Sequence, residues 1–350
     1  MNTQELYRIC NLFSEIIKVN PLKPITDLVE MYAKDGVLHI GATDGIMRVV
    51  ATLPCGEDLP NVVVTLSKIT KLLKLTHVSE ITLMDKESYL QFNGEGIYKI
   101  PKIFEEDGTK IALRLKMPEQ AEDATVFSVS ELRHAIKHNN VTLYVGDSTP
   151  ILSRYYNYEN NIITTNAMSL GISYGKLPLT EMYPILVEQL AALPSDFTFG
   201  VVNGGYRISC ENLELFTLIG SPNDFPFASL KNLLDFGSIC PNKVQINKAE
   251  ISDALKRIEL FKSLIEPIPS VYLQISEQKL NFVSDRVHET ISFEGDIDNK
   301  VEIEIKFNLN VLMSLIRKTE PDEMLTFGIG EKVIYFKDEL GVYMLAGMNQ

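Results

Sequence analysis

Three stretches of the chain begin a helix in the same way, and they lie about 120 residues apart. Asn2, Ser128 and Asn247 each precede a glutamate by three residues, and apolar residues follow at spacings of three and four. A Ser or Asn side chain at such a start accepts hydrogen bonds from the free amides of the first helical turn. The apolar spacing predicts an amphipathic helix behind each cap. A repeat of this length has the size of a domain, so the chain must fold as an array of similar domains.

The same series of elements follows each of these helices. Strand-like runs rich in β-branched residues come first: VLHIGAT, NIITTN and LNFVSD. A second, shorter helix is predicted in each repeat, at residues 65–75, about 184–193, and 308–318. A pair of strands then closes each repeat, within residues 80–103, 197–220 and 324–347. The sequence therefore predicts an α+β fold of three repeated domains at residues 1–120, 121–238 and 239–350.

One polar residue marks the end of the strand-like run in each repeat. These residues are Asp44, Asn166 and Asp285. A catalytic carboxylate need not recur as Asn, whereas a turn residue can, because Asp and Asn favour the same local backbone hydrogen bonds. We interpret all three as turn residues between strands.

Composition limits the class of protein. The chain of 350 residues is 45% hydrophobic and 23% charged, which is typical of a globular protein of two or three domains. No apolar run is long enough to span a bilayer, and the first residues do not resemble a secretory signal. Four scattered cysteines favour reduced core thiols in a cytoplasmic protein: Cys10, Cys55, Cys210 and Cys240.

The net charge of −13 argues against a protein that grips nucleic acid with its whole surface. Basic residues nevertheless gather on the polar faces of the predicted helices. Lys68, Lys71 and Lys74 form a row at three-residue spacing on one helix. If the three repeats present their helices on a common face, that face is basic on an acidic body. The residues predicted to face DNA are Arg8, Lys18, Lys68, Lys71, Lys74, Arg133, Lys137, Lys248, Lys256, Arg257, Arg317 and Lys318.

Motifs for catalysis or cofactor binding are absent from the sequence. It contains no GxxxxGK[ST], no GxSxG, no HExxH and no GxGxxG that opens a helix after a strand. His134 and His138 have a spacing that could bind zinc on a helix, but no further ligand completes such a site. We therefore predict a protein that is not an enzyme and has no metal or cofactor.

Several local stretches, in this order and spacing, resemble the bacterial-type DNA polymerase sliding clamp, the beta clamp. These are TTNAMSL at 164–170, SPNDFPF at 221–227, IEIKFNLNVLMSLI at 303–316 and YMLAGM at 343–348. In the first repeat, LHIGATDGIMRVV corresponds to the Thr-Asp junction of the clamp pattern. The resemblance covers nearly the whole chain. Its departures, such as Met168 and Ser169 where the family has His-Arg, indicate a divergent, phage or remote member.

The resemblance implies a ring-shaped, head-to-tail homodimer that encircles double-stranded DNA without reading its sequence. Helices would line the hole, and antiparallel sheets would form the outer layer. The ring would tether a DNA polymerase, and a clamp loader would place it on DNA. It would work in the cytoplasm of a bacterial cell or an infected host, away from membranes.

The resemblance also implies two protein-binding surfaces. Leu260 and Phe261, beyond the core stripe of their helix, would form the dimer seam with the first repeat of the other chain. A partner peptide would enter a cleft between the second and third domains. The cleft residues carried over by position are Leu152, Thr165, Met168, Leu170, Pro226, Met344, Ala346 and Met348.

Two other interpretations remain open on sequence grounds. The chain could be a non-catalytic structural or binding protein that uses the clamp fold without sliding on DNA. It could also be an enzyme whose site is assembled from distant residues, which an apolar pocket holding a carboxylate of perturbed pKa would indicate.

Overall fold

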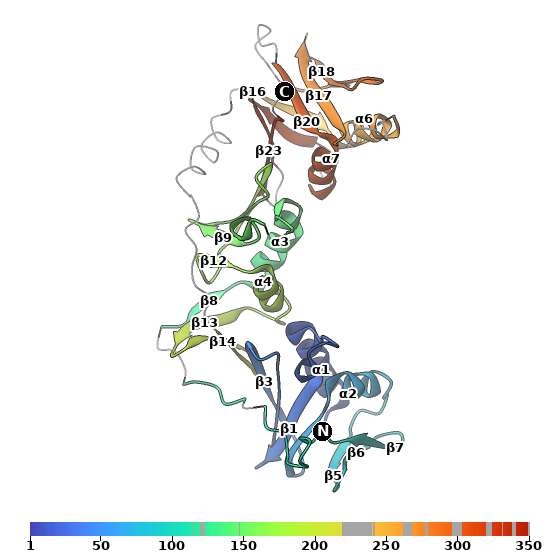
Figure 1. Ribbon diagram of the computed structural model, residues 1–350, viewed down its shortest axis with the longest axis vertical. Helices are drawn as coiled ribbons and strands as arrows, with labels where there is room; N and C mark the ends of the chain where they lie inside the picture. Colours follow the sequence, from blue (N-terminus) through green and yellow to red (C-terminus); the bar gives the residue numbers. More distant parts are fainter. Residues whose placement is uncertain are drawn as a thin grey trace. The chain divides into compact units, whose positions relative to one another are not determined.

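The computed structural model describes residues 1–113, 115–119, 123–146, 148–218, 240, 242–261, 268–276, 279–295, 303–319, 324–330, 332–337 and 341–348. The chain divides into two compact units. Unit 1 comprises Met1–Ser130 with Glu188–Ser221, and unit 2 comprises Glu131–Val187 with Pro222–Gln350. Figure 1 labels the elements, which are described here one unit at a time.

Unit 1 begins with two amphipathic helices that pack on each other. Helix α1 (Thr3–Ile17) starts where the sequence predicts, because the side chain of Asn2 accepts the amide of Glu5 at 3.0 Å. Its apolar stripe, including Ile9 and Phe13, is fully buried. Helix α2 (Leu66–Lys74) follows with N-cap Thr65.

An eight-stranded antiparallel sheet in unit 1 joins the first repeat to the second. Its strand order is β4-β1-β2-β3-β15-β14-β13-β8. The bounds are β1 Leu28–Lys34, β2 Val37–Thr43, β3 Met47–Pro54, β4 Leu59–Thr65, β8 Thr125–Phe127, β13 Phe197–Val202, β14 Gly205–Cys210 and β15 Leu213–Leu218. The junction is the pairing of β3 with β15, in which Arg48 lies opposite Phe216.

Unit 1 also holds a separate three-stranded sheet, in the order β5-β6-β7. Its strands are β5 (Thr82–Asp85), β6 (Tyr89–Asn93) and β7 (Ile97–Pro101). The amide of Thr3 donates to Ser79 and that of Ile81 donates to Met1, so the start of the chain runs alongside the segment before β5. A single antiparallel bridge joins Asn2 to Glu80.

Unit 2 repeats the eight-stranded design between the second and third repeats. The order is β12-β9-β10-β11-β23-β22-β21-β16. The bounds are β9 Tyr155–Tyr158, β10 Asn161–Thr165, β11 Ser169–Tyr174, β12 Glu181–Met182, β16 Asn242–Asn247, β21 Met324–Ile329, β22 Val333–Lys337 and β23 Gly341–Ala346. Here the junction is the pairing of β11 with β23, with Leu170 opposite Met344.

A four-stranded sheet and the remaining helices complete the described fold. The sheet has the order β19-β18-β17-β20. Its bounds are β17 Ser270–Ser276, β18 Lys279–Val283, β19 His288–Ser292 and β20 Ile303–Asn308. The helices are α3 Val129–Asn139, α4 Pro184–Ala191, α6 Lys248–Leu260 and α7 Leu309–Lys318; residues from Glu188 onward in α4 belong to unit 1. Three short 3₁₀ turns are η1 Pro24–Asp27, η2 Asn140–Thr142 and η3 Pro150–Leu152.

The predicted turn residues are confirmed in two repeats and wrong by one position in the third. Asp44 accepts the amides of Ile46 and Met47, and Asn166 accepts those of Met168 and Ser169. The backbone amide of Asp44 also donates to the carbonyl of Met47, and the backbone amide of Asn166 donates to the carbonyl of Ser169. In the third repeat Ser284, and not Asp285, makes this bond, to Val287.

Other predictions about the repeats need correction or stay untested. Three strands, and not a pair, follow the second helix of each repeat: β5–β7, β13–β15 and β21–β23. Near Ser128, the predicted cap of α3, the amide of Val129 donates to Asp196 at 3.0 Å, and Glu131 accepts the amide of Lys176. A cap formed by the Ser128 side chain itself stays a prediction. Both predicted domain boundaries, at 120/121 and 238/239, lie outside the described residues.

Removal of the α6 N-cap should lower stability. The Asn247 side chain accepts the amides of Ala249 and Glu250 at 2.9 and 3.2 Å. We expect Asn247→Ala to cost about 1 kcal/mol, because two first-turn donors lose their acceptor. Urea denaturation measures this loss. Asn247→Asp, which keeps the acceptor, should stay within about 0.5 kcal/mol of wild type; an equal loss in both variants would contradict the capping role.

Candidate nucleic-acid interface and partner surfaces

The clearest basic surface is the outer face of α2. Lys68, Lys71 and Lys74 are exposed, while Ile69 and Leu73 on the opposite face are buried. The helix carries no acidic residue, and none of the three lysines forms an ion pair with another described residue. Their charge is therefore available to a phosphate backbone.

The second helix of the third repeat, α7, has a smaller basic end. Arg317 and Lys318 are exposed in its last turn, and α7 contains no acid. The guanidinium of Arg317 lies 3.7 Å from the carboxylate of Glu259 on α6. Cations at a helix C-terminus also interact favourably with the helix dipole, so they have a local role besides any contact with DNA.

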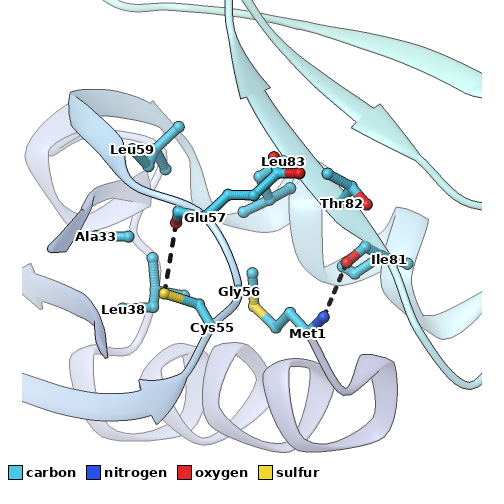
Figure 2. Close-up of a pocket in the computed structure, with 10 residues that line it drawn as sticks. All are labelled: Met1, Ala33, Leu38, Cys55, Gly56, Glu57, Leu59, Ile81, Thr82 and Leu83. Atoms are coloured by element: carbon cyan, nitrogen blue, oxygen red, sulfur yellow. Dashed lines mark hydrogen bonds between the residues drawn. The ribbon is translucent and has the colours of Figure 1, made fainter. Parts of the chain in front are cut away.

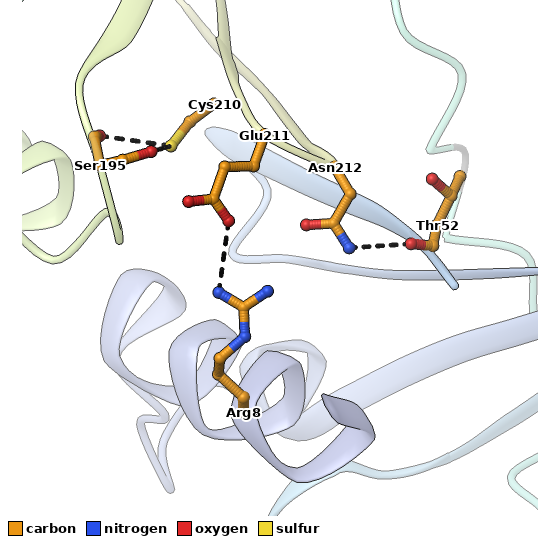
Figure 3. Close-up of polar contacts among 6 residues, drawn as sticks. All are labelled: Arg8, Thr52, Ser195, Cys210, Glu211 and Asn212. Carbon is orange, nitrogen blue, oxygen red and sulfur yellow. Dashed lines mark hydrogen bonds and ion pairs between the residues drawn. The ribbon is translucent and has the colours of Figure 1, made fainter. Parts of the chain in front are cut away.

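Arg8 and Lys18 take part in contacts within unit 1. Figure 3 shows the guanidinium of Arg8 directed at Glu211 in the turn between β14 and β15, at 3.4 Å. In the same turn, Asn212 donates to the carbonyl of Thr52 at 2.9 Å. Lys18, at the end of α1, pairs with Glu188 of α4. These acidic partners offset part of the charge of Arg8 and Lys18, two of the residues that we predict to face DNA.

The cations of α6 are balanced by acids. Arg257 makes two hydrogen bonds, of 2.8 and 2.7 Å, to Glu289 on β19. These bonds raise the pKa of Arg257 and lower the pKa of Glu289. Lys256 pairs with Asp253 at 2.9 Å, and the ammonium of Lys248 donates to the carbonyl of Thr319 at the end of α7. Helix α6 is thus a weaker candidate for DNA contact than α2.

On α3, Arg133 and Lys137 are exposed as predicted. His138, four residues after His134 on the same helix, does not share this exposure. His138 is fully buried, its ring stacks on Tyr343 with centroids 3.9 Å apart, and Nε2 lies 3.3 Å from the Val342 carbonyl. The apolar stripe of α3 is therefore wider than the spacing suggests.

The predicted cleft residues in unit 2 include both buried and exposed side chains. Leu170 and Met344 are cross-strand neighbours that are 4% and 3% exposed. Met168 is 47% exposed, and its carbonyl accepts the amide of the exposed Ala346 at 2.9 Å. Leu170 and Met344 cluster with residues that the sequence did not single out: Tyr156, Ile163, Ile172 and Tyr335.

The other cleft residues are distributed around this cluster. Leu152 ends η3, which is held to the sheet because the Tyr156 hydroxyl donates to the Ile151 carbonyl. Burial and the nearby carboxylate of Glu181 raise the pKa of Tyr156 to about 12, so its phenol stays a donor. Thr165 donates to the carbonyl of Ser169, and the amide of Met348 donates to Lys306. Pro226 lies outside the described residues.

A Cβ atom at Gly347 would lie 2.6 Å from Cγ2 of Ile305, so a larger residue at this position would require the Ile305 side chain to shift.

The two predicted seam residues are exposed at the end of α6. Leu260 is 81% exposed and Phe261 is 55% exposed. Large apolar side chains side by side in water are typical of a surface that another protein covers. The seam itself stays a prediction, since one chain is described.

Two cavities in unit 1 bear on the enzyme interpretation. Figure 2 shows the first, of 110 Å³, where the Cys55 thiol donates to the Glu57 carbonyl at 3.6 Å and the Met1 ammonium donates to Ile81. No histidine or second acid lines it. Cys55 is half-buried, unlike the other three cysteines, which are buried as predicted.

The second cavity has a volume of 330 Å³ and is lined in part by Glu30, Tyr32 and His39. The His39 ring stacks on Tyr32 with centroids 4.5 Å apart, and Glu30 accepts the amide of Leu113 at 2.9 Å. His39 and Tyr32 thus link β2 to β1, and Glu30 holds the segment that contains Leu113. Among the described residues, the carboxyl groups with a shifted pKa are Asp107, Asp253 and Glu289; hydrogen bonds lower the pKa of each, and none of the three lines either cavity.

The part of the chain that the structure describes lacks two further features, a metal site and a membrane-spanning helix. No group of three His, Cys, Asp or Glu side chains there is arranged to hold a metal ion. No helix among the described residues has the length and hydropathy to cross a membrane.

Comparison with solved structures identifies the fold. The chain is similar to a DnaN sliding clamp, DNA polymerase III subunit beta, from Bartonella birtlesii bound to griselimycin, with a TM-score of 0.77 and 14% identity over 100% of this chain and 99% of that chain. It is similar to the DNA polymerase III beta subunit of Thermotoga maritima, with a TM-score of 0.75 and 16% identity over 100% and 98%. It is also similar to the DNA polymerase sliding clamp of Bacillus subtilis, with a TM-score of 0.75 and 13% identity over 100% and 98%.

No protein-family model and no curated protein matches the sequence. The fold is nonetheless that of a DNA sliding clamp. More particularly, it is the fold of the beta subunit of DNA polymerase III over the whole chain, which confirms at the level of fold the resemblance seen in the sequence.

Proposed function

We propose that the protein is a DNA polymerase sliding clamp: a ring-shaped, head-to-tail homodimer that encircles duplex DNA and keeps a polymerase on its template. One observation carries the proposal. The junctions between the first and second repeats and between the second and third are built alike, and the chain carries the two unmatched halves of a third junction.

The sheets supply the first part of this argument. Strand β3 of the first repeat pairs with β15, and β11 of the second repeat pairs with β23. The corresponding strand of the third repeat is β19, and the strand of the first repeat that corresponds to β15 and β23 is β7. Strands β19 and β7 are both edge strands, which expose backbone groups ready to pair. Pairing β19 of each chain with β7 of the other closes a two-fold ring.

The register of this pairing follows from the repeats. Arg48 lies opposite Phe216, and Leu170 lies opposite Met344. The positions that correspond to these pairs are His288 on β19 and Lys99 on β7, judged from the matching hairpin registers. We therefore expect His288 of one chain opposite Lys99 of the other.

The helices supply the second part. At the first junction the end of α1 meets α4, where Gln189 donates to the carbonyl of Ile16 at 2.6 Å. At the second junction η2, directly after α3, contacts α7. By the same rule the end of α6, with Leu260 and Phe261, meets α2 of the second chain.

Burial on the second helices agrees with this rule. Leu190 of α4 and Leu315 of α7 are fully buried. Leu72, at the same distance from the helix start on α2, is only partly buried, and Leu75 at the end of α2 is 71% exposed. The uncovered leucines lie where the end of α6 would pack. Sequence comparison of the three second helices could have found them.

The charge pattern supports sliding on DNA in place of tight binding. The lysines of α2 and the basic end of α7 supply local positive potential on a chain of net charge −13. Contacts with phosphates carry no sequence information, so the ring can move along the duplex. Retention then comes from encirclement, and the protein needs no catalysis of its own.

The same proposal extends to partners and location. The apolar cluster around Leu170 and Met344, with Met168 on its rim, would receive an extended apolar peptide from the polymerase or the clamp loader, since Met side chains adapt to irregular partners. A clamp of this kind acts where DNA is replicated, in the cytoplasm of a bacterial cell or an infected host.

A second candidate is a non-catalytic binding protein that uses the clamp fold without sliding. The charge balance on α6 and the absence of Lys and Arg from α4 favour it, because they leave these two helices without a strong basic face. Such a protein could form the ring but would not extend synthesis by a polymerase.

Two measurements test the proposal. Light scattering should give a mass near twice 39.4 kDa; a stable monomer at micromolar concentration would contradict the ring. Primer extension on circular DNA with the cognate polymerase and loader should give longer products when the protein is added. Unchanged product length from a proven dimer would favour the second candidate.

Replacing Lys68 and Lys74 by Glu should weaken the interaction with DNA. Each cation that contacts a phosphate contributes about 0.9 to the slope of log K against log salt, so we expect the slope to fall by about two. Binding to short duplex DNA at several salt concentrations measures it. The matched control replaces Lys34 and Lys110, two exposed lysines outside the helices. Equal effects of the two double variants would refute the assignment of α2 to DNA.

A further inference from the structure

We propose that Lys71, although it lies in the lysine row of α2, is a subunit-interface residue whose ammonium donates to the C-terminal carbonyls of helix α6 in a second copy of the chain. The inference rests on the proposed ring. It divides the row into two functions, with Lys68 and Lys74 facing DNA and Lys71 holding the seam.

The first step is a comparison of positions on α2 and α4, the second helices of the first and second repeats. Lys71 lies six residues after Thr65, the N-cap of α2, and Gln189 lies six residues after Tyr183, which directly precedes α4. Lys71 and Gln189 are therefore at equivalent points of their helices. Burial agrees with this equivalence, because Ile69 of α2 and Val187 of α4 occupy the same step and are both fully buried.

The second step is the hydrogen bond that Gln189 makes to the end of α1. Gln189 is 4% exposed, and its Nε2 atom donates to the carbonyl of Ile16 in the last turn of α1. The final carbonyls of a helix lack N–H donors within the helix, and a side-chain donor from the next domain satisfies one of them. The first junction thus uses a donor at this position to fasten the end of the preceding first helix.

Lys71 can make the same contact in the other chain. It is exposed, and it forms no ion pair with another described residue. Its ammonium offers three donors, and a cation is favoured at a helix C-terminus by the dipole. Leu72, the next residue on α2, would pack against Leu260 and Phe261.

The neighbouring lysines occupy different positions. Lys74 corresponds to Arg317 of α7, counted from N-caps Thr65 and Asn308, and Arg317 is exposed in the described chain. Lys68 corresponds in the same way to Leu186 of α4, which makes no side-chain contact of the kind that Gln189 makes among the described residues. The interface role is thus specific to the middle lysine.

Sedimentation equilibrium without DNA tests the assignment on four full-length variants: Lys71→Glu, Lys71→Gln, Lys68→Glu and Lys74→Glu. We expect Lys71→Glu to raise the dimer dissociation constant at least tenfold, because an acid faces the negative end of α6 at both seams. Lys71→Gln keeps a donor and should stay within threefold of wild type. Lys68→Glu and Lys74→Glu should also stay within threefold, while lowering affinity for short duplex DNA. Circular dichroism of each variant shows whether it is folded.

The outcomes separate this inference from the proposed function. If wild type is a dimer and the three Glu variants weaken it equally, Lys71 has no special place and the inference fails while the clamp proposal stands. If Lys71→Gln weakens the dimer as much as Lys71→Glu, donation to a carbonyl is refuted. If wild type is a folded monomer, the ring and the interface role of Lys71 fail together.

Discussion

Replacing Leu260 and Phe261 by alanine should convert the protein from a dimer to a monomer. Both side chains are largely exposed in the single chain and would be buried at each of two seams. Burying a Leu or Phe side chain is worth about 1.5–3 kcal/mol, so truncating four of them should cost about 6 kcal/mol of dimer stability. Because 1.4 kcal/mol is a factor of ten, the dissociation constant should rise by about 10⁴.

Light scattering at micromolar concentration would detect this change in mass. Leu22→Ala is the matched control, because Leu22 is 90% exposed in a loop that has no place in the proposed seam. The control should remain dimeric. A double variant that keeps the mass of wild type would show that the end of α6 is not the contact.

Gly341→Ala should destabilise unit 2 by several kcal/mol, about 3 or more, through overpacking of backbone against backbone. Gly341 lies opposite Ser173 in the β11–β23 pairing. A Cβ atom there would lie 2.0 Å from the carbonyl oxygen of Ile172 and 3.0 Å from Nε2 of His138. Neither a main-chain carbonyl nor a fully buried His ring can move away cheaply, so the strands at this junction must separate.

Urea denaturation followed by far-ultraviolet circular dichroism measures the loss. Gly56→Ala is the control, since a Cβ atom at Gly56 would have nothing within 4 Å and its backbone needs no left-handed conformation. The control should stay within about 0.5 kcal/mol of wild type, as for other uncrowded surface sites. Similar midpoints for the two variants would mean that the β11–β23 junction is more plastic than its packing indicates.

Local structure was largely predictable from the sequence. Asn2 and Asn247 cap their helices as expected, because N-cap chemistry depends on a few neighbouring residues. Asp44 and Asn166 form the same turn for the same reason. The error at Asp285 has a physical cause. The amide and the hydroxyl of Ser284 both donate to the Val287 carbonyl, so Ser284 and not Asp285 holds the turn position in the third repeat.

Long-range contacts were less predictable. Nothing in the spacing of α3 shows that His138 stacks on Tyr343, because that partner lies in another repeat more than two hundred positions away along the chain. The ion pairs of Arg8 and Arg257 were missed for the same reason, so the sequence alone did not show which cations of the predicted basic face have acidic partners. The charge of a single helix says little until the acids of its neighbours are known.

The candidate cleft stays a prediction, and the sequence named only part of the apolar cluster that contains its buried residues. The sequence located Leu170 and Met344, which prove to be cross-strand neighbours. It did not identify Tyr156 or Tyr335, since a tyrosine in a strand looks the same whether it packs in a core or under a binding surface. The register across β9, β10, β11, β23 and β22 is what brings these side chains together.

Topological trapping on DNA tests the ring most directly. Lys99→Cys and His288→Cys, in a Cys55→Ser background, place two thiols opposite each other at each proposed seam. Monomers mixed with relaxed circular DNA, allowed to dimerise and then oxidised should be covalently closed around it. Protein oxidised before DNA is added serves as the control and should not be retained.

Gel filtration at high salt, before and after a restriction enzyme cuts the DNA once, gives the result. If the protein encircles DNA, we expect closed dimers to elute with circular DNA and to be released when the DNA becomes linear. Closed dimers that leave circular and linear DNA equally fast would contradict encirclement, and a failure of the two thiols to join would contradict the seam.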